Sequence, residues 1–327
     1  TEEAAPSKPY SKWHLFNPYA WGPIASSSDN QLYMGIESQN LLGTSIARIG
    51  YAYDANDQTN HYKANWNYLG FYTGLRAGVE VGDRRTTLPI DRMEPLDSFR
   101  TDRWQETTWN AGMFLPLQGL AGPWRLNLNG SIDFNLIQGK GYNLPLRFFT
   151  EVGPFQLPAL HYQLSGQALL RQSKRDILPR WGAAGVLSLR HSVGSGDLDG
   201  SQLGMRGQLF LPGIGRHHHL MIRGGYQQQG REDAYRFANT QFFPRGTAAT
   251  VVPEQVWTAT AEYRLPLAYP DWALGRWLYF QRFRAHVFAD YVQARNLPAQ
   301  VGGPVSGFEN YSVGIDWVAD FNALRLR

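Results

Sequence analysis

Residues 124–136, WRLNLNGSIDFNL, alternate between apolar and polar side chains with hardly a break. Successive side chains of a β-strand point to opposite faces, so this stretch sets an apolar face against a polar one. A period of two predicts a strand, whereas an amphipathic helix would repeat about every 3.6 residues. Trp124, Leu126, Leu128, Ile132 and Phe134 form the apolar face, and Arg125, Asn127, Asn129, Ser131 and Asp133 form the polar one.

The same alternation recurs along most of the chain, and no apolar helical pattern exceeds three turns. Glycine and proline recur too often for long helices. We therefore predict an all-β protein. The predicted strands are 29–39, 44–54, 61–71, 73–83, 104–115, 124–136, 159–171, 180–191, 202–211, 217–228, 255–266, 281–292 and 308–320.

Two architectures produce such strands: a soluble β-sandwich, which buries the apolar face, and a transmembrane β-barrel, which turns it to lipid. The predicted strands run for about 10 to 13 residues, a length that suits a tilted crossing of a bilayer better than a soluble strand. Tryptophans lie near strand ends, as in aromatic girdles. The polar faces carry full charges, which a small closed interior does not tolerate unpaired. We expect an antiparallel up-and-down transmembrane β-barrel of about 14 strands, with a range of about 12 to 16.

The number of predicted strands is odd, whereas single-chain bacterial barrels have an even number. Residues 10–22 are the candidate for the missing strand, either as an irregular first strand or as a segment inside the lumen, because Pro18 interrupts them. The alternative is a closing strand after Arg327. We accordingly divide the chain into an N-terminal segment, 1–28, which includes a periplasmic linker, and a barrel, 29–327.

Long and short connections alternate along the predicted strands, which places the long ones on the outer side of the membrane. Residues 267–280 form a long connection, yet the alternation places them on the periplasmic side. They do not fit this rule unless they partly continue the flanking strands. The longest connection after the first strands, 229–254, combines charged residues with Phe237, Phe242 and Phe243. We expect it outside the membrane, either folded over the mouth of the barrel or exposed as a docking surface.

The composition excludes several classes of protein. The chain of 327 residues contains no cysteine, which rules out disulfides, zinc–thiolate sites and cysteine catalysis. Its aromatic content of 14% is too high, and its charged content of 18% too low, for a disordered chain. No apolar run approaches the length of a transmembrane helix. The formal net charge is only +4 and no basic block is present, so we expect no nucleic-acid partner.

Three segments resemble known outer-membrane proteins: KPYSKWHLFNPYAWGP at 8–23, RDILPRWG at 175–182, and EYRLPLAYPDWALGRWLYFQRFRAHVFADY at 262–291. They are similar to the C-terminal barrel of Bacteroidota outer-membrane proteins in which a TolB-like (PD40, WD40-like) β-propeller precedes the barrel. The last segment also resembles, more loosely, the final strands of the Omp85/BamA surface-antigen superfamily. These motifs are structural, so the resemblance implies a fold and an outer-membrane location more than an activity.

Basic residues gather on the polar faces of the strands predicted between 202 and 292, and acidic residues accompany them. One interpretation is a constriction that attracts anions. The other, which opposite charges on adjacent strands favour, is a ladder of salt bridges that includes Glu262, Asp290 and Asp316. We predict that nine residues line the lumen: Arg206, Arg223, Glu262, Arg264, Arg282, Arg284, His286, Asp290 and Asp316.

His217, His218 and His219 form the most conspicuous group of metal-ligating residues. On a strand, His218 would point away from the other two, which would lie about 7 Å apart and need a third ligand such as Gln208 or Glu262. We expect a lumen or girdle role rather than a metal site. No catalytic motif has the context that it needs, so we expect no enzyme activity, metal or cofactor.

Three functions stay open. The first is a structural or anchoring barrel, as a subunit of an outer-membrane assembly or the base of a periplasmic propeller. The second is a passive porin-like channel for small polar or anionic solutes. The third is an Omp85-like insertase, for which no POTRA-like α/β pattern is present. The expected location is the bacterial outer membrane, with lipid, lipopolysaccharide and protein subunits of a larger complex as partners.

Overall fold

A computed structural model describes the chain as 15 β-strands. Among the described residues there is no helix, and hence none long and apolar enough to cross a membrane. The described residues are 15–26, 31–54, 59–89, 99–141, 153–173, 176–194, 196–230, 233, 235, 237, 239–245, 253–275, 277–300 and 303–323.

The strands are hydrogen-bonded to one another in sequence order, and the pairs are antiparallel. The order changes near the end of the sheet, where β12 pairs directly with β14. The short strand β13 and the last strand β15 both pair with β14 as well. The strands are β1 (Pro18–Ser26), β2 (Gln31–Gln39), β3 (Ser45–Asp54), β4 (Thr59–Tyr68), β5 (Gly74–Pro89), β6 (Phe99–Ala121), β7 (Trp124–Lys140), β8 (Phe155–Leu170), β9 (Gly182–Ser192), β10 (Ser201–Pro212), β11 (His219–Gln229), β12 (Gln255–Ala268), β13 (Trp272–Leu274), β14 (Leu278–Gln300) and β15 (Gly303–Ala323).

Each predicted strand coincides with an observed one, and two further strands are present. The first is β1, which overlaps the candidate strand 10–22 from Pro18 onward, while residues 10–14 lie outside the described residues. The second is β13, which lies in the connection 267–280 and pairs with β14. The predicted strands 281–292 and 308–320 are too short, because β14 and β15 extend toward each other as a long hairpin.

The chain folds as two compact units, and the first comprises residues 1–115, 132–143 and 153–159. It holds β1 to β5 with the adjoining parts of β6, β7 and β8. A short turn joins β2 to β3, where the side-chain Oδ1 of Asn40 accepts hydrogen bonds from the backbone N–H groups of Thr44 (2.8 Å) and Ser45 (3.0 Å). On the polar face, Arg76 forms an ion pair with the buried Asp133.

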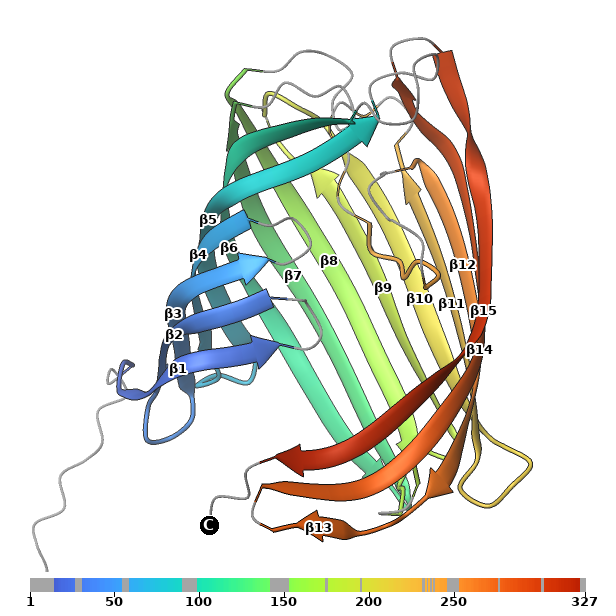
Figure 1. The fold of residues 1–327 in the computed structure, drawn as a ribbon. Helices are drawn as coiled ribbons and strands as arrows, with labels where there is room; N and C mark the ends of the chain where they lie inside the picture. The colour runs from blue at the N-terminus through green and yellow to red at the C-terminus, as the bar shows by residue number, and fades with distance from the viewer. Residues whose placement is uncertain are drawn as a thin grey trace, which may run out of the picture. The chain divides into compact units, whose positions relative to one another are not determined.

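The second unit comprises residues 116–131, 144–152 and 160–327. It holds β9 to β15 with the adjoining parts of β6, β7 and β8, and its strands lie side by side in Figure 1. A two-residue turn, Gly122–Pro123, connects β6 to β7, where Gly122 has a φ of 58° that favours glycine. All nine residues that the sequence assigns to the lumen belong to this unit.

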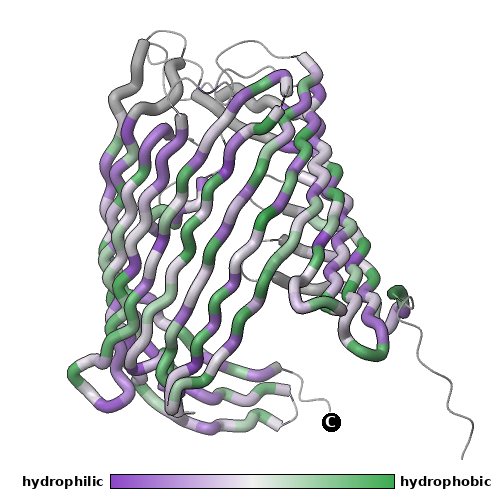
Figure 2. The backbone as a smooth tube through the Cα atoms, turned by 180° about the vertical axis from the view of Figure 1, so that it is seen from behind, coloured by the Kyte–Doolittle hydropathy of each residue, from purple (hydrophilic) through white to green (hydrophobic). Residues whose placement is uncertain are grey.

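Burial along the strands is the reverse of that in a soluble protein. The apolar side chains of Leu128 and Trp317 are 45% and 75% exposed, whereas Asp133 and Glu262 are 5% and 1% exposed. Figure 2 shows the underlying alternation of hydrophobic and hydrophilic residues along each strand. So many exposed apolar side chains need an apolar surrounding, and buried charges need partners. This pattern is typical of strands that face lipid on one side and a polar interior on the other.

Candidate functional site

The strand register aligns the charged residues of the second unit in rows on its polar face. Arg264 on β12 lies opposite His286 on β14, which lies opposite Asp316 on β15. Two rows further along, Arg223 on β11 lies opposite Thr260 on β12, which lies opposite Asp290 on β14. Because residues two apart on a strand share a face, both rows point to the same side of the sheet.

Glu262 lies at the centre of a group that we call the Glu262 cluster, with Arg223, Arg245, Arg264 and His286. Its Oε1 lies 2.5 Å from Nε of Arg264 and 3.3 Å from Nδ1 of His286. Its Oε2 lies 2.7 Å from Nη2 of Arg245 and 3.7 Å from Nη2 of Arg223. A carboxylate that is only 1% exposed is thus surrounded by three guanidinium groups, which offset the cost of removing its charge from water.

Arg245 does not belong to the sheet but to the connection between β11 and β12. Its guanidinium lies 3.7 Å from the centre of the Phe288 ring and 3.1 Å from Oδ2 of Asp316, in addition to the contact with Glu262. Its backbone N–H donates to Oδ2 of Asp290 over 3.4 Å. One side chain from a connection therefore contacts three strands, β12, β14 and β15.

The preceding residues of the same connection also lie on the polar face. We call residues 239–245 the inward segment; Figure 1 draws it in pale orange beside β10 to β12. The side chain of Gln227 on β11 donates to Oδ1 of Asn239 (2.9 Å) and accepts from the backbone N–H of Thr240 (2.7 Å). Gln241 donates to the backbone carbonyl of Tyr226 (3.0 Å). Backbone and side-chain hydrogen bonds thus fix the segment to β11.

Two glycines leave the space that the inward segment fills. A Cβ atom placed on Gly225 would lie 1.9 Å from Oε1 of Gln241, and one on Gly204 would lie 2.7 Å from Oγ1 of Thr240. No side chain larger than hydrogen fits at Gly225 while Gln241 keeps this position. The sheet is therefore shaped to receive the segment, which is how glycine serves a close approach of two chain segments.

Two of the phenylalanines in this connection differ in their exposure, and both contact other residues of this unit. Phe237 is only 4% exposed and its ring packs against Tyr235, with the ring centres 5.0 Å apart. Phe242 lies over the polar face, between the guanidinium groups of Arg206 (5.4 Å) and Arg223 (5.5 Å). Phe237 thus has its partner within the connection, whereas Phe242 contacts arginines of β10 and β11 and stays more than half exposed.

The other residues of the predicted ladder have partners different from those expected. Arg282 and Arg284 both pair with Asp320, over 2.7 Å and 3.0 Å, and not with the three carboxylates of the prediction. Asp290 accepts from Ser312 (3.4 Å) and from the backbone of Arg245. The register explains the difference, because Asp320 lies opposite Arg282 at the far end of β15.

The three consecutive histidines diverge instead of forming a ligand set. His217 lies in the turn before β11 with a φ of 64°, and its Nδ1 is 2.7 Å from Oδ1 of Asp176. His218 contacts the hydroxyl of Tyr263 (2.9 Å), and His219 begins the strand and is fully buried. Among the described residues no group of three His, Cys, Asp or Glu side chains could hold a metal ion.

The contact between His217 and Asp176 lies outside the membrane-spanning strands. Burial alone would raise the pKa of Asp176, but hydrogen bonds from His217 and Ser173 outweigh it and lower the pKa below its ordinary value. The carboxylate therefore stays ionised and joins the turn after β8 to the turn before β11.

Sequence reasoning missed the most important contact of the site. Arg245 is one of several charged residues in a long connection, and alternation says nothing of where such a connection folds. The excess of basic residues that the predicted strands place around Glu262 gave no signal for Arg245, because this residue adds a further positive charge. The run Phe242-Phe243-Pro244-Arg245 is too apolar for a freely exposed loop.

Comparisons with known proteins find similar structures but no similar sequence family. No protein-family model matches the chain, and no curated protein matches it by sequence. Sixty-two chains of solved structures match. Among them are CdiB from Escherichia coli (TM-score 0.52, 13% identity, 92% of this chain and 55% of that one) and BamA from Haemophilus ducreyi lacking POTRA domains 1–3 (0.50, 11%, 89% and 67%). CdiB from Acinetobacter baumannii matches with a TM-score of 0.48 at 11% identity, over 87% of this chain and 50% of that one.

The fold-class prediction is confirmed: the chain has the antiparallel up-and-down β-barrel fold also found in BamA and CdiB. The likeness extends over about nine tenths of this chain, 89% with BamA and 92% with CdiB from Escherichia coli. At such identities it shows the fold alone. The chain spans about half the length of the CdiB structures and 67% of the BamA structure.

Proposed function

We propose that this chain is an integral outer-membrane β-barrel of the Omp85 type, in which the inward segment closes the polar interior and its release opens a path. The observation that carries the proposal is the position of Arg245, which connects the segment to Glu262, Asp316 and Phe288 on three strands. The exposed apolar faces and the likeness to BamA and CdiB support the membrane location.

A gated barrel fits these contacts better than a passive pore. A passive channel needs an unobstructed polar interior, as in porins. Here a segment of the chain covers part of the polar face and is held by charge-assisted hydrogen bonds to a buried carboxylate. Such bonds are strong enough to keep a segment in place, yet each is a single contact that a partner or a substrate can replace.

The anchoring role and the Omp85-like insertase stay predictions. An anchoring barrel needs no movement of the inward segment, so it predicts a barrel that never conducts. An insertase needs a weakly paired seam and additional domains for its substrate. The resemblance to Bacteroidota propeller proteins likewise stays a prediction. Of these, the anchoring role differs from the gated barrel in the ion conductance that it predicts.

Single-channel recording in planar bilayers tests the gated barrel. The wild-type chain should show rare, brief openings, and Arg245→Gln should lengthen them, because the inward segment loses its contacts with Glu262 and Asp316. Gly225→Ala should lengthen them less, since the new methyl group displaces only the end of the Gln241 side chain. Arg282→Gln is the matched control, because this arginine pairs with Asp320 outside the Glu262 cluster.

Two outcomes would overturn the proposal. A steadily open wild-type channel whose conductance Arg245→Gln leaves unchanged would identify a passive pore. A complete lack of openings in the wild type and in both variants, with correctly folded and inserted protein, would favour the anchoring role.

A further inference from the structure

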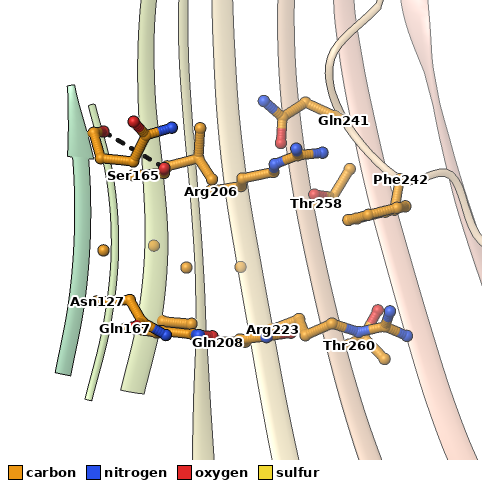
Figure 3. A pocket seen from close by; sticks show the side chains of 17 residues that line it. Asn127, Ser165, Gln167, Arg206, Gln208, Arg223, Gln241, Phe242, Thr258 and Thr260 are labelled. Carbon is orange, nitrogen blue, oxygen red and sulfur yellow. Dashed lines mark hydrogen bonds between the residues drawn. The ribbon is translucent and has the colours of Figure 1, made fainter. Parts of the chain in front are cut away.

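A pocket of about 450 Å³ lies on the polar face of the second unit, next to the Glu262 cluster. Figure 3 shows its side chains in two rows that face each other across a floor of backbone. The strand register explains the rows: Gln208 lies opposite Arg223, and Arg223 lies opposite Thr260, while Thr258 lies one row further along. The inward segment supplies the remaining wall through Gln241 and Phe242.

The pocket is positively charged although it lies beside a carboxylate. No aspartate or glutamate lines it, whereas Arg206 and Arg223 do. Arg206 forms no ion pair with any described residue: its Nη1 donates to the backbone carbonyl of Thr240 over 3.4 Å. Arg223 shares Glu262 with two other arginines, at the longest distance of the three. The guanidinium groups therefore keep the capacity to bind an anion.

Three buried polar atoms in the pocket have no hydrogen-bond partner among the residues that the structure describes. They are Oδ1 of Asn129, Oε1 of Gln241 and Nε of Arg223. Two of them are acceptors and need a donor, and the third is a donor and needs an acceptor. Gln241 is only 8% exposed, so its unpaired oxygen is costly unless something else satisfies it.

An apolar surface completes the site. The side chain of Phe242 is 57% exposed although the segment that carries it is fixed to the sheet. Its ring borders the pocket between Arg206 and Arg223, as the close view in Figure 3 shows. A ligand that matches all these features must offer hydroxyl donors, a negative charge and a flat C–H face.

We propose that this pocket is a binding site for a short acidic saccharide, a chain of uronic-acid sugars. The carboxylate of one sugar accepts hydrogen bonds from Arg206 and Arg223, and its hydroxyl groups donate to Asn129 and Gln241. The C–H face of the ring packs on Phe242. The proposal concerns recognition and does not depend on whether the inward segment moves to open a path.

Isothermal titration calorimetry on the full chain, folded in detergent micelles, tests the proposal with three probes: trigalacturonate, maltotriose and inorganic phosphate. Trigalacturonate should bind, and the other two should bind at least about tenfold more weakly. Maltotriose lacks the charge, and phosphate lacks the sugar ring and its hydroxyl groups.

Three variants locate the binding site. Arg206→Gln should weaken the binding of trigalacturonate about tenfold, since it removes a charged donor and no ion pair. Phe242→Leu should weaken it as well. Arg295→Gln, an exposed arginine on β14 outside the pocket, should change nothing.

Several results would overturn the saccharide site. Equal affinity for phosphate and trigalacturonate would mean that the arginines attract any anion and that no sugar is recognised. Equal affinity for maltotriose, which is uncharged, would show that the carboxylates of the sugar do not contribute to binding. Unchanged binding in Arg206→Gln, a variant that breaks no ion pair, would place the ligand elsewhere, and so would a lack of binding by the folded wild-type chain.

Discussion

Glu262 shows how a single buried charge organises this protein. Its carboxylate contacts Arg264 on its own strand and Arg223 on the neighbouring strand, and Arg245 reaches it from a connection. The sequence allowed us to predict that Glu262 would take part in cross-strand ion pairs, because the adjacent strands place basic residues on the same face. It did not allow us to predict Arg245, because the position of a connection depends on tertiary contacts and not on a local period.

Neutralising this carboxylate should destabilise the fold. Glu262→Gln leaves Arg223, Arg245 and Arg264 close together without their shared anion, so we expect the free energy of unfolding to fall by about 3–5 kcal/mol. Urea-induced unfolding in lipid vesicles measures it. Glu309→Gln, at an exposed position on β15, is the control and should leave the free energy of unfolding nearly unchanged. A loss as small as that of the control would show that the cluster does not support the fold.

At the scale of the strand, alternation was sufficient to predict where the chain forms the sheet and which face is polar. Alternation did not predict the ends of the strands. β14 continues to Gln300 and β15 begins at Gly303, although apolar and polar residues no longer alternate there. Backbone pairing between two adjacent strands is enough to extend a hairpin there, and no side-chain pattern is needed. The turn residues His217 and His218 were also assigned to a strand, because three histidines in a row give no turn signal.

A pair of substitutions on β7 tests the assignment of its two faces. Leu128 is exposed on the apolar face, so Leu128→Arg should lower the free energy of unfolding by about 2–4 kcal/mol in a bilayer. Asn129→Arg places the same side chain on the polar face one residue later and should cost clearly less. Unfolding titrations in vesicles compare the two. Equal costs at both positions would show that the faces are assigned wrongly.

The two turns joined by Asp176 and His217 predict a dependence of stability on pH. Because folding lowers the pKa of Asp176, its contribution to stability is present above the unfolded pKa of about 4 and is lost as the pH falls through the lower folded value. Asp176→Asn should therefore destabilise the protein at pH 6, and the difference from wild type should shrink below pH 4. Unfolding titrations across this range measure it; a difference that grows on acidification would contradict the assignment.

At the scale of the whole molecule, the exposed apolar side chains decide how the protein behaves in solution. Trp317 and Val313 on β15 are 75% and 74% exposed, and similar residues recur on other strands. We expect the folded chain to sediment with outer membranes and to need detergent for extraction. Fractionation followed by gel filtration checks this. A folded monomer that stays soluble in buffer without detergent would contradict the membrane location.

The central claim is that the connection between β11 and β12 folds onto the polar face, and a disulfide tests it most directly. A Cβ atom on Gly204 would lie 3.6 Å from Cβ of Thr240, within the range of about 3.5–4.5 Å that disulfides show. The chain has no cysteine of its own, so Gly204→Cys combined with Thr240→Cys gives the only two thiols. Mild oxidation of this variant in native membranes should form an intramolecular disulfide that mass spectrometry detects and that neither single variant forms. Two thiols that stay free and react fully with maleimide in the folded protein would contradict the account.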